Sequence, residues 1–417
     1  MPDIKQYQQS SFQEGCRELG YRVRMITELE MINSVLIDLE HRPTGAGHIH
    51  IGNDDRENTF SVAFKTVPTD STGVAHILEH TVLCGSRKFP VRDPFFSMLK
   101  RSLNTFMNAF TASDWTMYPF CTQNKKDFYN LLDVYLDASF YPNIDRLSFR
   151  QEGHRLEIEG IPEKDWHLVY KGVVYNEMKG AMSSPDQVMV RSMLNAMYPD
   201  TTYRHNSGGD PVVIPTLTHA QLKQFHQRHY HPSNSFFYTY GNLPLMEHLR
   251  IIHDKVLKHH DRLDPNTTVM PQPRWKEPRR ATYWYPLDSG TDASKKSQVC
   301  VTWLACDIQD AFQILVFKLL EQILLGNSAS PLRKALMDSA LGSALSDGTG
   351  FDADNRDTLF ACGLKDVAES DAQMIESLVL RVLEKLVGEG LESRRVVGGL
   401  VGGGGGRGVV WVGGGGG

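Results

Sequence analysis

The chain has 417 residues, of which 41% are hydrophobic, and a chain of this size can bury at least two ordinary hydrophobic cores. Its formal net charge is only -5, and no basic patch interleaved with aromatic residues occurs, so we expect no nucleic acid and no anionic membrane as a partner. No apolar run reaches the roughly 18 residues that a membrane-spanning helix needs.

The N-terminus and the cysteines bear on the compartment. The first ten residues lack the basic start and apolar centre of a signal peptide, and also the Arg-rich, acid-poor character of a transit peptide. The six cysteines include no CxxC pair and no disulfide-framework spacing, so we expect mostly buried thiols in a reducing compartment. From these features we expect a cytoplasmic protein of bacterial type.

From its N-terminus the chain predicts antiparallel sheet flanked by helices, which is an α+β architecture. Strands are expected where short apolar runs are bounded by Gly, Pro, Asn or Asp, and helices where apolar residues recur with a period near 3.6. The expected strands lie at 34–40, 48–51, 59–66, 106–121 and 235–241. The expected helices lie at 74–83, 95–103, 125–140, 173–182, 186–197 and 218–229.

The expected helix at 74–83 carries an HxxEH motif formed by His76, Glu79 and His80, with capping residues at 70–73 before it. Residues four apart lie on one helix face, so both histidines can direct an imidazole nitrogen at one metal ion. Glu177, in a second helix-compatible stretch, is the natural third ligand, because two histidines and a glutamate form an established catalytic zinc set.

A zinc ion held by three protein ligands keeps one position for water and lowers the pKa of that water to about 7. Glu79 beside the ion would then be the general base that removes the proton. The motif therefore predicts zinc-dependent peptide hydrolysis without a covalent intermediate. Two alternatives stay open, namely an amphipathic helix whose histidines bind no metal, and cobalt or manganese in the same ligands.

A polar, Pro-rich stretch at 259–290 suits a linker, and a second unit without a metal motif follows it. After Ser393 the sequence turns Gly-rich, which cannot build a packed element, so we interpret it as artefactual or disordered. In the second unit the expected strands lie at 297–305 and 358–364, and the expected helices at 311–325, 329–339 and 371–388. We therefore divide the chain into a zinc-binding domain (1–258), a linker (259–290), a partial second domain (291–393) and a low-complexity tail (394–417).

Four blocks of sequence stand out by their residues and their order along the chain. They are His-Ile-Leu-Glu-His-Thr-Val-Leu-Cys-Gly-Ser (76–86), Phe-Pro-Val-Arg-Asp-Pro-Phe (89–95), Asn-Ala-Phe-Thr-Ala-Ser-Asp-Trp-Thr-Met-Tyr-Pro (108–119) and Gly-Val-Val-Tyr-Asn-Glu-Met-Lys-Gly (172–180). Together they resemble the pitrilysin/insulinase metallopeptidases, and their wording is closest to the presequence-protease branch. The resemblance runs in matching order from about residue 15 to about residue 390.

Carried over residue by residue, the resemblance implies zinc ligands His76, His80 and Glu177, with Glu79 as the base. Tyr170 departs from the pattern, because many members of this family carry a second carboxylate there. The group that orients the ligands from outside the metal site is therefore left open.

The resemblance also implies that Asn108, Ala109 and Phe110 belong to a strand edge that receives the substrate. An extended peptide can add to an exposed sheet edge through main-chain hydrogen bonds, which bind many sequences. We therefore expect short unstructured peptides as substrates. An ordinary aromatic-rich strand packed on its own core is the competing interpretation of residues 108–120.

The resemblance implies a fold of two homologous domains that together form half of a peptidase clamshell. We expect the second domain to be incomplete, and the chamber to need a missing C-terminal half or a partner chain for its closure. A chain of this kind should bind zinc and hydrolyse peptides weakly or not at all. The alternatives are a half-size subunit that works as a dimer, similar to processing peptidases, and a non-catalytic peptide-binding subunit.

Overall fold

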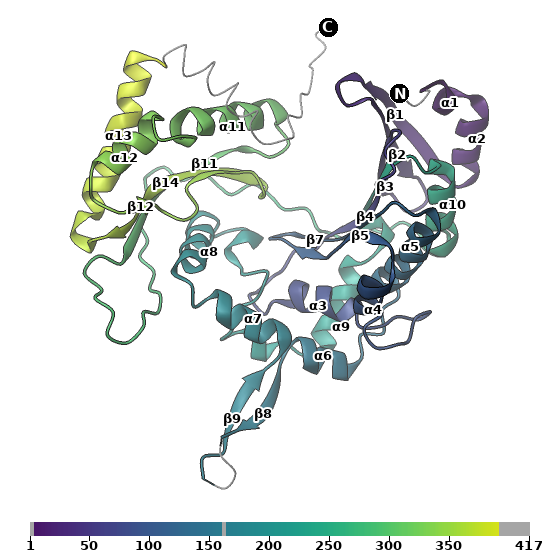
Figure 1. Cartoon of the computed structure of the whole chain (residues 1–417), viewed down its shortest axis with the longest axis horizontal. Coiled ribbons are helices and arrows are strands. Elements are labelled where there is room, and N and C mark those ends of the chain that lie inside the picture. The colour runs from purple at the N-terminus through teal and green to yellow at the C-terminus, as the bar shows by residue number, and fades with distance from the viewer. Residues whose placement is uncertain (1–3, 161–163, 392–417) are drawn as a thin grey trace. The chain divides into compact units, whose positions relative to one another are not determined.

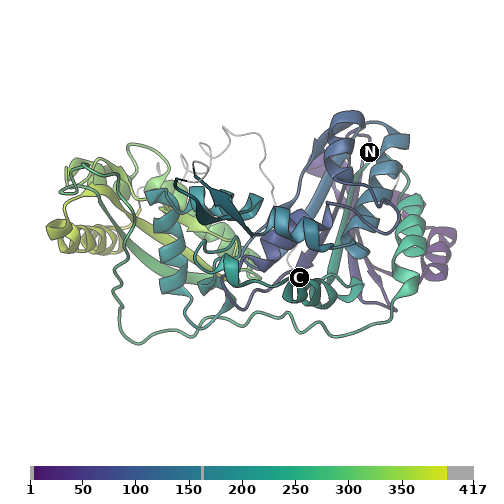
Figure 2. The same ribbon diagram turned by 90° about the horizontal axis from the view of Figure 1, so that it is seen from below.

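The computed structural model of the chain describes residues 4–160 and 164–391, so the Gly-rich tail expected at 394–417 lies outside the described residues. The chain divides into two compact units. Unit 1 comprises residues 1–180 and 205–269, and unit 2 comprises residues 181–204 and 270–417. The segment from 260 to 296, which contains the last of the three boundaries between the units, has no helix or strand (Figure 2).

Unit 1 is built on one eight-stranded sheet in the order β1-β2-β3-β10-β4-β7-β5, with β6 also paired to β7 (Figure 1). Its strand pairs are antiparallel, apart from β10 and β3, which are parallel. The strands are β1 (Tyr21–Leu29), β2 (Ser34–His41), β3 (Ala46–Gly52), β4 (Asn58–Lys65), β5 (Asn104–Met107), β6 (Phe110–Thr111), β7 (Trp115–Thr122) and β10 (Ser235–Gly241).

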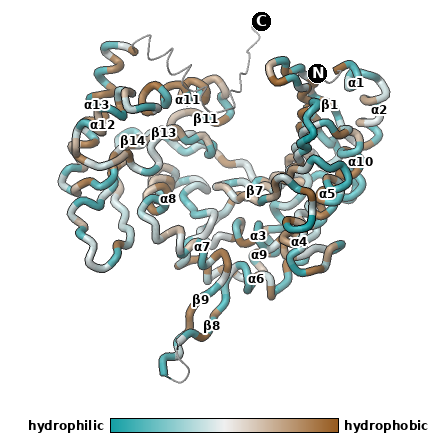
Figure 3. Tube along the Cα trace, in the orientation of Figure 1, coloured by the Kyte–Doolittle hydropathy of each residue, from teal (hydrophilic) through white to brown (hydrophobic). Residues whose placement is uncertain are grey.

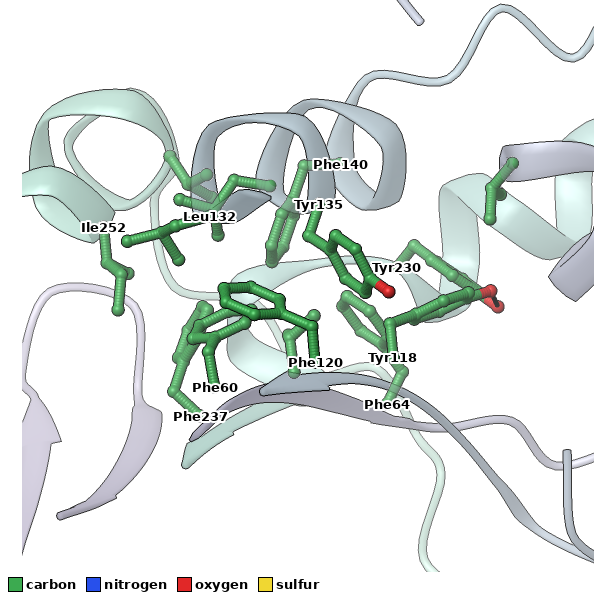
Figure 4. Close-up of a cluster of buried hydrophobic side chains, with 14 of the residues drawn as sticks. Phe60, Phe64, Tyr118, Phe120, Leu132, Tyr135, Phe140, Tyr230, Phe237 and Ile252 are labelled. Carbon is green, nitrogen blue, oxygen red and sulfur yellow. Dashed lines mark hydrogen bonds between the residues drawn. The ribbon is translucent and has the colours of Figure 1, made fainter. Parts of the chain in front are cut away.

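One face of this sheet forms the core of unit 1. In β2, Val35 and Ile37 are fully buried while Asp38 on the opposite face is half-buried, as the two-residue period of a strand requires. Aromatic side chains from the sheet and from α5 fill the core, and the ring centroids of Phe60 and Phe120 lie 5.4 Å apart (Figure 4). The helices of unit 1 are α1 (Ile4–Gln8), α2 (Ser10–Glu18), α3 (Val74–Val82), α4 (Pro94–Arg101), α5 (Lys125–Phe140), α6 (Arg146–Glu152), α7 (Val173–Ala181), α9 (His219–His229) and α10 (Leu245–Lys255).

A two-stranded hairpin connects α6 to α7 and projects beyond their ends (Figure 1). It consists of β8 (Arg155–Glu159) and β9 (His167–Lys171), which pair only with each other. At its base the backbones meet so closely that a Cβ on Gly172 would collide with the carbonyl oxygen of Gly153. Glycine at 172 therefore holds the end of α6 against the start of α7.

Unit 2 contains a smaller sheet in the order β11-β14-β12, with β13 also paired to β14, and all its pairs are antiparallel. Its core joins β14 to three helices, of which α11 is strongly apolar along its length (Figure 3). On the other side, the hydroxyl of Tyr198 donates to the carbonyl oxygen of Asp357 at 2.5 Å. The elements are α8 (Pro185–Met197), β11 (Ser297–Asp307), α11 (Ala311–Leu325), α12 (Pro331–Asp338), β12 (Ala344–Leu345), β13 (Gly350–Asp352), β14 (Asp357–Val367) and α13 (Ala372–Glu389).

The α+β class with mainly antiparallel sheets flanked by helices is confirmed, and helices α5 and α11 have the predicted bounds. Strand β1 was not predicted, because only Tyr21 in it is buried and its exposed positions are largely charged or polar. His48 and His50 are both buried in β3, and a ring nitrogen of each lies 2.9 Å from the hydroxyl oxygen of Thr239. Within residues 4–160 and 164–391, no helix combines the length and the apolar character that crossing a membrane requires.

Candidate active site

The HxxEH motif lies on α3, as predicted, and the helix brings its two histidines onto one face. The rings of His76 and His80 have centroids 5.0 Å apart and lie nearly perpendicular to each other. Glu177 approaches from α7, and Oε2 of this residue lies 3.8 Å from Nε2 of His76. One ligand atom from each of the three residues lies within 4.8 Å of the other two.

These separations are compatible with a tetrahedral zinc site. Zinc bonds of about 2.0–2.2 Å at tetrahedral angles place two ligand atoms about 3.4 Å apart, so small side-chain rotations would close the set. Glu177 is half-exposed, which leaves it free to make such a rotation. The described residues contain no second group of this kind.

The carbonyl oxygen of Gly208 fixes the orientation of His76. Nδ1 of His76 lies 3.1 Å from this oxygen, and since a carbonyl can only accept, Nδ1 must carry the proton. The lone pair of the neutral ring then lies on Nε2, the atom that faces Glu177. Gly73, at the start of α3, makes this contact possible, because a Cβ there would lie only 2.7 Å from the same carbonyl oxygen.

Gly73 also corrects the predicted start of the helix. Capping by a hydroxyl from residues 70–73 was expected, but the N-cap position is Gly73 itself, with φ of 70° and no side-chain cap. Asp70 instead accepts hydrogen bonds from the backbone and hydroxyl of Thr72. Helix α3 therefore begins at a glycine, which allows the close approach of the Gly208 backbone, and not at a residue whose side chain caps the helix.

His80 is oriented by a carboxylate that was not predicted from the sequence. Nδ1 of His80 lies 3.1 Å from Oε2 of Glu152, at the end of α6, and Gln151 donates to the other oxygen at 2.9 Å. Burial opposes ionisation of both groups, but their mutual hydrogen bond and the opposite charges nearby together outweigh it, so the pKa of His80 is raised and the pKa of Glu152 is lowered. Such carboxylate–histidine pairs fix the ring and strengthen a metal ligand.

Glu79 is buried beside the two histidines, and its Oε2 accepts a hydrogen bond of 2.6 Å from Oγ1 of Thr111 in β6. Near this carboxylate, the hydroxyl oxygens of Tyr118 and Tyr230 lie 2.7 Å apart. Burial raises the pKa of both phenols, so they remain neutral donors near the carboxylate. The arrangement places one carboxylate next to the candidate metal site without making it a ligand.

The residues expected at the substrate-binding edge lie near this carboxylate but not all in a strand. Phe110 belongs to β6, whereas Asn108 and Ala109 lie between β5 and β6, so the expectation of a strand edge through all three is wrong in part. The backbone N–H of Asn108 donates to the carbonyl of Pro119 at 3.2 Å. Phe110 pairs with Met117 in β7, and its side chain is partly exposed.

Tyr170, which departs from the resembled pattern, lies in β9 and orients neither histidine. Its ring lies near those of His154 and Tyr175. Glu152 and the Gly208 carbonyl take the orienting role instead. No local spacing in the sequence could have identified Glu152, because the hairpin separates it from α7 and the contact with His80 is tertiary.

Comparison with known proteins identifies the family of the chain. Residues 67–184 match the family described as insulinase (peptidase family M16), and residues 216–396 match the peptidase M16 inactive domain. The chain belongs to the M16 peptidase family. The HxxEH helix, Glu152 and Glu177 all lie within the first matched region, and neither match includes the N-terminal strands of the sheet.

The curated relatives of this M16 chain include mitochondrial presequence proteases. The chain is 47% identical to the one from Xenopus laevis over 378 residues, which is 90% of this chain and 37% of the relative. It is 39% identical to the Drosophila melanogaster protein over 401 residues, 95% of this chain and 38% of the relative. The chain thus spans less than two-fifths of the length of the curated relatives it matches.

Solved structures share the fold at low sequence identity. A protease from Helicobacter pylori superposes with a TM-score of 0.63 at 19% identity, covering 86% of this chain and 82% of that one. Pitrilysin superposes with a TM-score of 0.58 at 17% identity, covering 90% of this chain and 39% of that one.

The expectation of a cytoplasmic protein of bacterial type is wrong. The curated relatives are named as mitochondrial, in vertebrates, insects and fungi alike. The expectation failed because it took the first residues of this sequence for the start of the whole protein, and a chain that spans about 37% of its relatives gives no basis for that.

Proposed function

We propose that this chain carries the zinc-binding part of an endopeptidase that hydrolyses short unfolded peptides. The observation that carries the proposal is the grouping of His76, His80 and Glu177 within 4.8 Å, next to the buried carboxylate of Glu79. The donor set suits one Zn²⁺ per chain, because both histidines have their Nδ1 occupied and can offer Nε2.

Bound zinc would polarise the scissile carbonyl and acidify a water molecule in the open position. The protein's own contribution is to hold the reacting groups. Glu79 would take the proton from the attacking water and pass it to the leaving amine, as a general base and then a general acid. Its position on α3 between the two histidines keeps it within reach of the site without competing for the metal.

The peptide would bind along β6. This strand pairs with β7 on one side, and no other strand of the described residues pairs with its second edge. An extended peptide can add there through main-chain hydrogen bonds, which give little sequence preference. Asn108, Ala109 and Phe110 are the proposed binding residues, and Phe110 supplies an exposed apolar side chain on the strand itself.

The name of the curated relatives, presequence protease, suggests cleaved targeting peptides as the substrate class. We propose that the zinc-binding domain spans 1–258 and is joined by the linker 259–290 to a partial second domain at 291–393. Since the relatives are much longer, full turnover is expected to need further polypeptide, either a C-terminal half or a partner chain, to enclose the substrate.

The proposal is tested by measuring bound zinc and then the cleavage of a quenched unstructured peptide by the chain and by Glu79→Gln. The proposal is supported if the chain binds stoichiometric zinc and cleaves the peptide slowly, and Glu79→Gln abolishes the cleavage. It is also supported if the chain binds zinc but cleaves the peptide only after a C-terminal half is added. A chain that takes up no zinc overturns the proposal and favours a non-catalytic peptide-binding subunit. Full turnover by the chain alone would refute the need for further polypeptide.

A half-size subunit that works as a dimer is the second candidate. The fold is found in proteins of similar length, since the chain covers 82% of the Helicobacter pylori protease and 83% of the M16 inactive domain from Pseudomonas fluorescens. Sedimentation of the zinc-loaded chain distinguishes the two candidates. A stable dimer with peptidase activity would favour the second one.

A further inference from the structure

The carboxylate assigned above as the base is held by a hydroxyl group of the sheet edge. Thr111 donates from Oγ1 to Oε2 of Glu79 at 2.6 Å. Its main chain belongs to β6 and pairs with Thr116 of β7. One residue therefore joins the strand proposed to receive the peptide to the helix that carries the HxxEH motif.

Two further threonines extend this contact into the sheet. Oγ1 of Thr116 lies 3.4 Å from Oγ1 of Thr111 and 2.8 Å from Oγ1 of Thr66, and both inner threonines are fully buried. An ionised carboxylate only accepts, and each hydroxyl has one proton to give. All three bonds can form together only if Thr66 donates to Thr116, Thr116 to Thr111, and Thr111 to Glu79. A row polarised in one direction strengthens its last bond.

We propose that Thr111 is a positioning residue for the base, and this inference rests on the proposed peptidase function. By occupying Oε2, Thr111 leaves Oε1 of Glu79 as the oxygen that accepts the proton. Among the described residues, Oε1 has no hydrogen-bond partner. The buried threonines behind Thr111 offer its oxygen a donor on the inner side, which favours the orientation that directs its proton to Glu79 before a peptide binds.

Alternatively, Thr111 has only a structural role, in which its hydrogen bond attaches β6 to α3. Loss of the hydroxyl would then disturb the metal site and the sheet edge together. If Thr111 positions the base, loss of its hydroxyl should leave zinc affinity unchanged and lower only the affinity for ligands that share a proton with Glu79. The readout must therefore separate metal binding from contact with the base.

The test uses zinc-loaded chain and a short peptide hydroxamate, which binds the metal and shares its proton with an adjacent carboxylate. We expect Thr111→Val to weaken hydroxamate binding about 10- to 100-fold, the usual cost of losing a hydrogen bond to a charged group. Thr111→Ser should restore it to within about threefold, since the hydroxyl is retained. Zinc affinity, measured by chelator competition, should be the same in all three proteins.

Thr105→Val is the matched control, because it also removes a threonine-to-glutamate hydrogen bond, the one to Glu57, from neighbouring strand β5. It should change neither zinc nor hydroxamate binding. In a Glu79→Gln background, Thr111→Val should add little further loss, because the two residues act through one contact.

Three outcomes overturn the inference: unchanged hydroxamate affinity in Thr111→Val, a parallel loss of zinc affinity, or an equal loss with and without Glu79. A wild-type chain that takes up no zinc or binds no hydroxamate overturns the proposed function itself. A failure confined to the Thr111 variants leaves that function standing.

Discussion

At the scale of single residues, the candidate site depends on which atoms occupy the second nitrogen of each histidine. His76 uses a backbone carbonyl and His80 uses a carboxylate, so the two rings have orienting partners of different charge. A carbonyl cannot be removed by substitution, whereas Glu152 can. The contribution of an orienting partner to metal affinity can therefore be measured at His80, by substituting Glu152.

We expect Glu152→Ala to lower zinc affinity about 10- to 100-fold, because His80 loses the partner that fixes its ring and raises its basicity. Glu152→Gln, which keeps an acceptor but no charge, should lie between this variant and the natural protein. Glu159→Ala is the control, since this exposed carboxylate of the hairpin accepts a hydrogen bond from Lys171 and lies outside the candidate site. Equal zinc affinities in Glu152→Ala and Glu159→Ala would show that the pair does not support the metal site.

At the scale of elements, the hairpin β8–β9 determines the relation between Glu152 and Glu177. Glu152 ends α6 just before the hairpin, and Glu177 lies in the helix just after it. The crossing of Gly153 and Gly172 at its base brings these two helices together. A substitution at Gly153 or Gly172 should therefore alter the geometry of the metal site, although neither glycine is among its ligands.

Gly172→Ala tests this link, with Gly180→Ala in the same segment as control. A Cβ at 172 collides with Gly153 and lies 3.0 Å from Cα of His154, so we expect a loss of about 1–3 kcal/mol in unfolding free energy and weaker zinc binding. A Cβ at 180 meets nothing within 4 Å, and alanine there should stabilise α7 by about 0.5–1 kcal/mol. Equal effects of the two changes on zinc binding, measured by chelator competition, would contradict this role of the crossing.

The sequence was sufficient for elements and contacts that follow from local periodicity. Helix α5 and the HxxEH face could be predicted because apolar residues, or ligands, recur every three to four positions. Helix α6 has seven residues and the hairpin after it is mostly exposed, so neither gives a strong period. The Glu152 and Thr111 contacts follow from tertiary packing, which no spacing rule in one sequence encodes.

At the scale of the whole molecule, histidine is distributed very unevenly. All 16 histidines lie between His41 and His260, and every one belongs to unit 1. Burial, together with a smaller contribution from a neighbouring histidine in each case, lowers the pKa of His48, His50 and His248 to about 3. Each of the three has a ring nitrogen without a hydrogen-bond partner in the described structure. Acid should therefore act on the two units differently.

We expect unit 1 to lose stability as the pH falls below about 6.5, while unit 2 does not. An unfolded histidine takes up its proton near pH 6.5 and the buried ones only near pH 3, so the unfolded state binds more protons in between. Below pH 6.5 each of these histidines therefore lowers the free energy of unfolding by up to about 1.4 kcal/mol per pH unit.

Hydrogen exchange with mass spectrometry, corrected for the intrinsic pH dependence of exchange, should show faster opening of β3 and β10 at pH 5 than at pH 7. Segments of β14 are the internal control, because unit 2 contains no histidine. Equal sensitivity of both units between pH 7 and pH 5 would rule out the histidines as the cause.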